Sequence, residues 1–160
     1  MIADDGRPQI MDSGLSLIIT RSDFTIASVC GPCRWMSPEV LDPSDEYYVY
    51  DADDTSATPS YTSPFSEKSD VYSLGMMIME VITGKAPYHH RRHDTVVILD
   101  VIRGTLPPRP AENLVSDGLW DLLKSCWQKL PENRPTAKIV ELWLETLRWT
   151  EGIQTLHKIS

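Results

Sequence analysis

The sequence predicts a mainly α-helical domain with a small β-hairpin at its N-terminus. Three stretches carry this prediction: within residues 69–84, the apolar residues from Val71 to Ile82 fall on every side at helical spacing, and residues 117–127 and 136–147 each carry apolar residues along one face. A helix that is apolar all round is buried in protein or lipid, and roughly a dozen residues are too few for the about 20 that span a bilayer. Residues 71–82 are therefore predicted to be the central helix of a globular core.

The N-terminal residues 1–11 are expected to form a hairpin, because two short apolar pieces flank Asp5-Gly6, a pair typical of tight turns. A hairpin of this size is marginal by itself, so the chain is expected to begin within a larger fold. Residues 15–28 mix apolar residues with Ser, Thr and Arg without a period, which predicts an irregular loop.

A separate segment, residues 42–64, is predicted to be an acidic, flexible insertion. Its Thr58-Pro59 and Ser63-Pro64 pairs fit proline-directed phosphorylation, although an ordinary loop containing prolines is the better interpretation. The net charge of −8 largely reflects this segment, and the sequence predicts no nucleic-acid binding. Six of the 23 acidic residues lie in it without a Lys or Arg among them: Asp42, Asp45, Glu46, Asp51, Asp53 and Asp54.

Both ends of the central helix are marked in the sequence. Ser69 or Asp70 is expected to cap the free N–H groups of the first turn, and Gly84 to supply the left-handed residue after the last turn. The remaining elements are expected to pack around this helix.

The stretch after the central helix begins with the run His-His-Arg-Arg-His at residues 89–93. We interpret it as a solvated basic loop rather than a metal site, because only Asp94 stands near it at ligand spacing. A short amphipathic helix is predicted over residues 95–102, ended by Gly104 and the prolines that follow.

Two further helices complete the predicted core. One begins at Asp117, is capped by Ser116 and is ended by Pro131. Its apolar face comprises Leu119, Leu122, Leu123, Cys126 and Trp127. The last helix begins at Thr136 and is expected to turn Ile139, Leu142, Trp143 and Leu147 inward, leaving residues 151–160 as a tail.

Three cysteines do not make a disulfide framework, and the N-terminus lacks the basic and apolar regions of a signal peptide. No segment approaches the length of a membrane span. The cytoplasm, or else the nucleus, is the expected location.

The tetrapeptide Cys30-Gly31-Pro32-Cys33 matches the redox motif of thioredoxins. That motif requires a buried strand before it and a long helix after it, where the helix dipole lowers the pKa of the first thiol. Neither is predicted here, so dithiol redox chemistry at Cys30 and Cys33 is only an alternative.

Several pieces, in order along the chain, resemble the C-terminal lobe of a protein kinase. Asp12-Ser13-Gly14 resembles the magnesium-binding Asp-Phe-Gly turn, and Trp35-Met36-Ser37-Pro38-Glu39 resembles the Ala-Pro-Glu end of the activation segment. The run from Lys68 to Gly75 is similar to the start of the family's central helix. Cys126-Trp127, Pro131 and Arg134-Pro135 resemble a run found in tyrosine kinases and tyrosine-kinase-like Ser/Thr kinases.

This resemblance implies roles for individual residues. Asp12 would hold magnesium beside the phosphates of ATP, and Glu39 would form a buried ion pair with Arg134 that serves stability. Asp70 would accept hydrogen bonds from the catalytic-loop backbone. Candidates for phosphorylation in the activation loop are Thr20, Ser22, Thr25 and Ser28.

The same comparison shows motifs that these 160 residues do not contain. Missing are the Gly-rich loop, the strand Lys with its helix Glu partner, and the His-Arg-Asp loop with its Asn. Two matched positions also depart from the family: Ser13 replaces a Phe, and Pro32 stands where Ser/Thr kinases have a Thr. No kinase activity is expected from this polypeptide alone, and a full-length parent with these replacements is expected to be weak or inactive.

The resemblance therefore implies a partial kinase domain over residues 1–150 without its N-terminal lobe. Residues 1–41 would be the metal-binding turn and activation segment, residues 42–64 the insertion and residues 65–150 the helical core. Three interpretations remain open: a piece of a kinase that phosphorylates protein Ser/Thr (less readily Tyr), a non-catalytic scaffold that binds partner proteins, or a truncated product without independent function. No membrane partner is expected.

Overall fold

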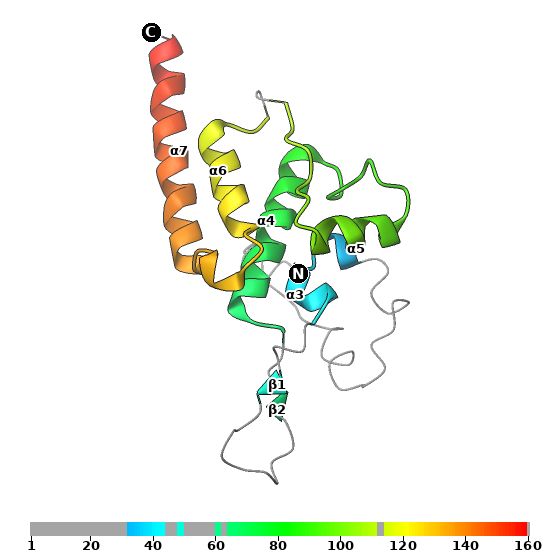
Figure 1. Ribbon diagram of the computed structural model, residues 1–160. Helices are drawn as coiled ribbons and strands as arrows, with labels where there is room; N and C mark the ends of the chain where they lie inside the picture. The colour runs from blue at the N-terminus through cyan, green and yellow to red at the C-terminus, as the bar shows by residue number, and fades with distance from the viewer. Residues whose placement is uncertain (1–31, 44–47, 50–59, 62–63, 112–113, 160) are drawn as a thin grey trace, which may run out of the picture. The chain divides into compact units, whose positions relative to one another are not determined.

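The computed structural model describes residues 32–43, 48–49, 60–61, 64–111 and 114–159. For residues 151–159 and for the two short strands, it describes the backbone only. Five α-helices dominate this part of the chain, so the mainly α-helical class is confirmed for it (Figure 1). The predicted hairpin at residues 1–11 and the loop at 15–28 lie outside the described residues. In chain order the elements are η1 (Pro32–Arg34), α3 (Pro38–Leu41), β1 (Tyr48–Val49), β2 (Ser60–Tyr61), α4 (Glu67–Thr83), α5 (Asp94–Ile102), α6 (Asp117–Cys126), η3 (Pro131–Asn133) and α7 (Ala137–Ile159).

Helix α4 begins earlier than the sequence suggested. Its N-cap is Ser66, whose Oγ accepts from the backbone N–H of Ser69 while Ser69 Oγ accepts from the N–H of Ser66. The prediction of Ser69 or Asp70 as the cap was wrong, because this reciprocal box starts the helix one turn upstream. The predicted C-terminus is confirmed: Gly84 adopts a left-handed conformation at φ 66°.

The core is built around one side of α4. Met76 and Met79 are buried there, whereas Met77 and Val81 are 49% and 76% exposed. Complete burial of this helix, as its apolar sequence implied, is therefore wrong for the described part of the chain. The buried cluster comprises Val71, Tyr72, Met76, Met79, Tyr88, Val97, Val101, Val115, Leu122, Leu123, Cys126, Trp127 and Val140.

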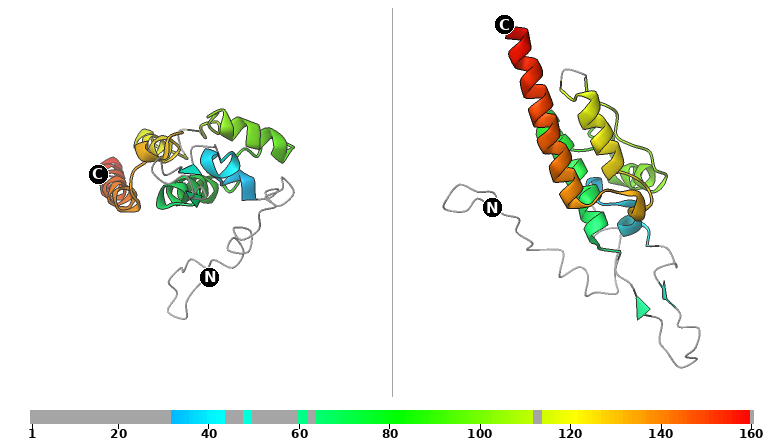
Figure 2. Two further views of the ribbon diagram at one scale, coloured as in Figure 1. Left: turned by 60° about the horizontal axis from the view of Figure 1, so that its bottom comes forward. Right: turned by 90° about the vertical axis from the view of Figure 1, so that its left-hand side faces the viewer.

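Helix α5 agrees with its prediction, whereas α6 begins at the predicted residue but ends at Cys126, so the prediction that Pro131 ends it was wrong. Ser116 caps α6 by accepting from the backbone N–H of Leu119 at 3.3 Å. Helix α6 packs against both α4 and α7, and α5 packs against η1 and α3 (Figures 1 and 2). Residues 32–41 therefore lie beside α5, a helix about 60 residues later in the chain.

Helix α7 is rotated relative to its prediction. Val140 is its buried residue, with Trp143 and Leu147 packed against the core, while Ile139 and Leu142 are 49% and 50% exposed. The inward placement of Ile139 and Leu142 was wrong, because α7 carries apolar residues on two faces and a sequence period does not say which face meets α6. The helix also continues through the predicted tail to Ile159.

The acidic segment contains one element that its composition did not predict. Strand β1 pairs with β2 in antiparallel register, with Tyr48 opposite Tyr61 and Val49 opposite Ser60. The prediction of a flexible insertion over residues 42–64 rested on composition, which gives no signal for strands at these four positions.

Candidate functional site

The candidate site is built on residues 32–41, a short segment shaped by two prolines. Pro32 opens η1, and Pro38 occupies the first turn of α3, where a residue without a backbone N–H costs no hydrogen bond. Residues 36–40 are all buried. A segment with so little regular structure needs side-chain contacts to hold it against the helices.

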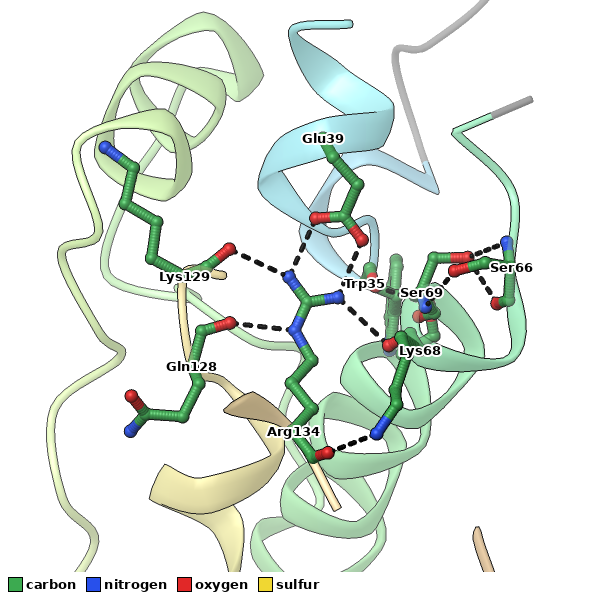
Figure 3. A network of polar contacts seen from close by, with 9 residues as sticks. Trp35, Glu39, Ser66, Lys68, Ser69, Gln128, Lys129 and Arg134 are labelled. Carbon is green, nitrogen blue, oxygen red and sulfur yellow. Dashed lines mark hydrogen bonds and ion pairs between the residues drawn. The ribbon is translucent and has the colours of Figure 1, made fainter. Parts of the chain in front are cut away.

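The first of these contacts is an ion pair between α3 and the loop before α7. Arg134 Nη1 and Nη2 donate to Glu39 Oε1 and Oε2 at 2.6 and 2.7 Å, across 95 residues of chain (Figure 3). The side chains are 0% and 7% exposed. A two-pronged pair of this kind fixes both the distance and the orientation of the groups it joins.

The guanidinium of Arg134 has all five of its N–H groups in hydrogen bonds. Its acceptors are the two oxygens of Glu39 and the backbone carbonyl oxygens of Lys68, Gln128 and Lys129. Lys68 Nζ in turn donates to the backbone oxygen of Arg134. Arg134 therefore joins α3, the start of α4 and the turn after α6 at one buried point (Figure 3).

A second contact ties residues 32–41 to α4. Trp35 Nε1 donates to Glu80 Oε2 at 2.9 Å, and Ser73 Oγ donates to the backbone oxygen of Trp35 at 2.8 Å. Both partners lie on α4, so Trp35 is held at its side chain and at its backbone.

A third contact, made by Arg34, ties the segment to residues 87–94. Arg34 Nε and Nη2 donate to Asp94 Oδ1 at 3.1 and 2.8 Å, with the two side chains 15% and 29% exposed. The remaining N–H groups donate to the backbone oxygens of Pro87, Tyr88 and Arg91. Arg34 thus bridges η1 to the loop before α5.

Tyr88 holds that loop in an unusual backbone conformation. Its φ of 53° is uncommon for a residue with a side chain, while its ring is buried and its hydroxyl donates to the backbone oxygen of Thr105 at 2.7 Å. Burial raises the pKa of Tyr88 and of its hydrogen-bonded neighbour Tyr72. The Arg134 guanidinium lies 5.1 Å from the centre of the Tyr72 ring, so the contacts around Arg134 extend to this tyrosine pair.

The structure brings together some of the residues singled out from the sequence and leaves others apart. Glu39 and Arg134 are in direct contact, as described above, whereas Asp70 is exposed on the first turn of α4. Asp12, Cys30 and the phosphorylation candidates Thr20, Ser22, Thr25 and Ser28 lie outside the described residues.

Cys33, the second thiol of the thioredoxin-like tetrapeptide, is buried inside η1. That element has three residues, and α3, the next helix, has four. A redox thiol of that type depends on the N-terminus of a long helix, so this surrounding does not favour dithiol chemistry.

Sequence reasoning missed the contacts of Arg34 and Trp35. Their partners lie 60 and 45 residues away along the chain. The only local signal was the position of an Arg-Trp pair between two prolines, and that pattern does not predict which residues the two side chains contact.

The described residues contain no candidate for a metal cluster or a membrane span. No group of three or more His, Cys, Asp and Glu in that part of the chain is arranged to hold a metal ion, and the loop at residues 89–93 is included in this result. No helix among them combines the length and apolar character that crossing a bilayer requires.

The fold and the site define a mainly helical domain in which a proline-bounded segment is anchored by a buried Glu–Arg pair. Residues 1–144 match the family described as protein tyrosine and serine/threonine kinase. The chain belongs to this protein kinase family.

Three relatives show how the chain relates to longer kinases. It is 32% identical over 131 residues to the dual specificity protein kinase shkD of Dictyostelium discoideum, covering 81% of the chain and 15% of that protein. It is 28% identical over 155 residues to the tyrosine-protein kinase Src64B of Drosophila melanogaster, a match that covers 96% of the chain and 24% of that protein. It is 34% identical over 118 residues to the human cytoplasmic tyrosine-protein kinase BMX, a match that covers 73% of the chain and 14% of that protein. The chain thus spans about a quarter or less of the length of each.

Proposed function

We propose that these 160 residues form the activation segment and helical lobe of a protein kinase catalytic domain, which in a longer polypeptide transfers phosphate from ATP to Ser or Thr of a protein substrate. The observation that carries this proposal is the buried pair of Glu39 and Arg134, which joins residues 32–41 to the helical core. In this role Asp12 contributes to magnesium binding and Asp70 accepts hydrogen bonds from the catalytic-loop backbone. Thr20, Ser22, Thr25 and Ser28 are the candidate phosphorylation sites.

By themselves, the 160 residues are proposed not to catalyse phosphoryl transfer. They contain no match to the Gly-rich loop, the phosphate-binding Lys or the His-Arg-Asp loop. Phosphoryl transfer depends almost entirely on positioning and electrostatic stabilisation, so a chain without these parts has little with which to accelerate it. The proposed location is the cytoplasm, because the relative BMX is named a cytoplasmic tyrosine-protein kinase.

A second candidate function is a non-catalytic lobe that binds partner proteins. Pro32 favours it, because this exposed residue of η1 offers neither a hydroxyl nor a backbone N–H at a position where Ser/Thr kinases have a Thr. The sequence Asp12-Ser13-Gly14 is a second departure from the active-kinase pattern.

A chimera distinguishes the two functions. The part of shkD that precedes its matched region is joined to residues 1–160, and ADP formation from Mg-ATP is measured with separate peptides that contain Ser, Thr or Tyr as the only acceptor. The kinase proposal predicts that the chimera phosphorylates the Ser and Thr peptides and that the isolated chain forms no ADP.

A chimera that melts cooperatively but stays inactive, even with Ser13→Phe and Pro32→Thr, would favour the binding module. Phosphorylation of the Tyr peptide alone would contradict the proposed Ser/Thr specificity. ADP formation by the isolated chain would contradict its proposed inactivity.

A further inference from the structure

The loop before α5 concentrates basic residues in a chain that is acidic as a whole. Residues 85–93, which we call the cationic loop, contain six basic residues and no acidic one, whereas the whole chain has a net charge of −8. Like charges placed together repel one another unless water, salt or an anionic partner compensates them. The six basic residues are Lys85, His89, His90, Arg91, Arg92 and His93.

The backbone of the cationic loop is held from inside the molecule. Arg34 donates to three of its carbonyl oxygens, those of Pro87, Tyr88 and Arg91, at 3.0, 2.9 and 3.1 Å. The Tyr88 ring is buried, and its hydroxyl donates to the backbone oxygen of Thr105. These contacts fix the shape of the loop without a partner, and a preformed surface loses less conformational entropy when it binds.

The two acidic residues of α5 are already engaged. Asp94 accepts from Arg34, and Asp100 Oδ2 accepts from Arg91 Nε at 2.8 Å. In the described part of the chain, no carboxylate forms an ion pair with Lys85 or Arg92. The cationic loop therefore keeps positive charge that this part of the chain does not neutralise.

The side chains that remain available are exposed, namely those of Lys85, His89, His90, Arg92 and His93. His93 precedes α5, but its side chain makes no capping hydrogen bond. Every imidazole ring carries at least one N–H donor, and a planar guanidinium matches a carboxylate. The ring centres of His89 and His90 lie 6.1 Å apart, close to the roughly 6.5 Å between alternate side chains of an extended peptide.

An acidic peptide fits this surface better than nucleic acid does. At physiological salt, exposed charges more than about 8 Å apart are largely screened, so a short acidic segment can meet the loop without meeting the acidic remainder of the chain. Duplex DNA carries one charge per roughly 1.7 Å along its whole length. It would extend beyond these nine residues over a chain whose net charge is −8.

We propose that the cationic loop binds an acidic segment of a partner protein. In this complex Lys85 and Arg92 pair with carboxylates of the segment, and the histidine rings donate hydrogen bonds to it. Exposed ion pairs are individually weak, so the affinity should be modest and should fall as the salt concentration rises. This proposal rests on the loop and its contacts and does not depend on the proposed function.

Fluorescence anisotropy with the purified full chain tests the binding. The probe is a short labelled peptide of alternating Glu and Ser residues, and the reference peptide has Gln in place of every Glu. The Glu peptide should bind in a salt-dependent manner, whereas the Gln peptide should not bind. The double variant Lys85→Glu, Arg92→Glu should bind the Glu peptide about tenfold more weakly, because two exposed attractions become repulsions.

The matched control is the double variant Lys138→Glu, Arg148→Glu, which changes the net charge equally at two exposed residues of α7. Helix α7 lies on the other side of the helical core from α5 (Figures 1 and 2). This variant should bind the Glu peptide nearly as tightly as the unchanged chain. Both double variants should keep its melting temperature closely, because all four side chains are exposed.

Two results would overturn the proposal. The first is that the Glu peptide does not bind the unchanged chain or binds no better than the Gln peptide. The second is an equal loss of binding in the two double variants, which would indicate only a response to net charge.

A labelled single-stranded DNA oligonucleotide tests the alternative partner. It should bind the unchanged chain less tightly than the Glu peptide does. Tighter binding of the oligonucleotide, lost in Lys85→Glu, Arg92→Glu, would contradict an acidic peptide as the partner and would indicate a nucleic-acid contact at the cationic loop.

Discussion

At the scale of single residues, the site depends on one buried cation. Arg134 is 2% exposed, and a guanidinium stays charged at any ordinary pH. Three of its hydrogen bonds go to backbone carbonyls, which satisfy its geometry without neutralising its charge. Among the described residues, Glu39 forms the ion pair with this cation. Loss of the Glu39 carboxylate would leave the buried Arg134 charge without a counter-ion.

Glu39→Ala should therefore lower the free energy of unfolding by about 3–5 kcal/mol. Glu141→Ala is the matched control, because Glu141 pairs with Lys138 on the exposed surface of α7, where an ion pair contributes roughly 0–1 kcal/mol. Urea unfolding of both variants measures the difference. Similar small losses in the two variants would mean that the buried pair does not hold the segment.

A second residue-scale prediction concerns alkaline pH. Burial raises the pKa of the Cys126 thiol from 9.0 to about 11, so the folded state keeps its proton where the unfolded state loses it. The stability that this thiol contributes is fully present below pH 9 and is lost as pH rises from about 9 to 11. Buried Tyr72 and Tyr88, whose pKa values are also raised, extend the decline to higher pH.

Urea unfolding at a series of pH values should thus show stability falling above pH 9. In Cys126→Ala the fall between about pH 9 and 11 should be shallower, whatever the absolute loss from the smaller side chain. The same slope in both proteins would show that Cys126 does not contribute.

At the scale of elements, the contact between α4 and the C-terminal end of α6 requires a glycine at position 75. A Cβ at Gly75 would lie 2.7 Å from Trp127 Nε1 and 3.0 Å from Cys126 Cβ. Both atoms belong to buried residues, so neither can move aside cheaply. The identity of this residue thus sets the distance between the two helices.

Gly75→Ala should lower stability by about 1–3 kcal/mol through overpacking. Gly118→Ala in α6 is the control, because the closest atom to its added Cβ is the side-chain end Leu147 Cδ2, which can shift. That change should be neutral or stabilising by up to about 1 kcal/mol, the helix preference of Ala over Gly. The order of the two melting temperatures checks the prediction, and a reversed order would contradict it.

The elements also show what the sequence could predict. Helix α6 followed from a capping Ser and a single apolar face, both of which are local signals. The beginning of α4 was missed because Ser66 lies outside the apolar run, and the rotation of α7 because both of its faces are apolar. Local patterns fix where a helix forms, whereas its contacts with other elements select the face that it buries.

At the scale of the molecule, the site is an assembly of distant segments. Glu39 and Arg134 could be named together only through the family resemblance, since 95 residues separate them. Nothing in the spacing of Arg34 pointed to Asp94 and the backbone oxygens near it. Most of the anchoring of residues 32–41 was therefore beyond prediction, because it depends on how α4 and α5 fold back against the segment.

We propose that these residues supply the anchored segment and helices of a kinase domain but do not bind nucleotide by themselves. Thermal unfolding of the purified chain with increasing Mg-ATP tests it most directly, because a ligand at 100 times its dissociation constant stabilises a protein by about 2.7 kcal/mol. We predict a cooperative transition whose midpoint does not change with Mg-ATP. A clear rise in the midpoint that disappears in Asp12→Ala would contradict the claim and show that a phosphate site exists within these 160 residues.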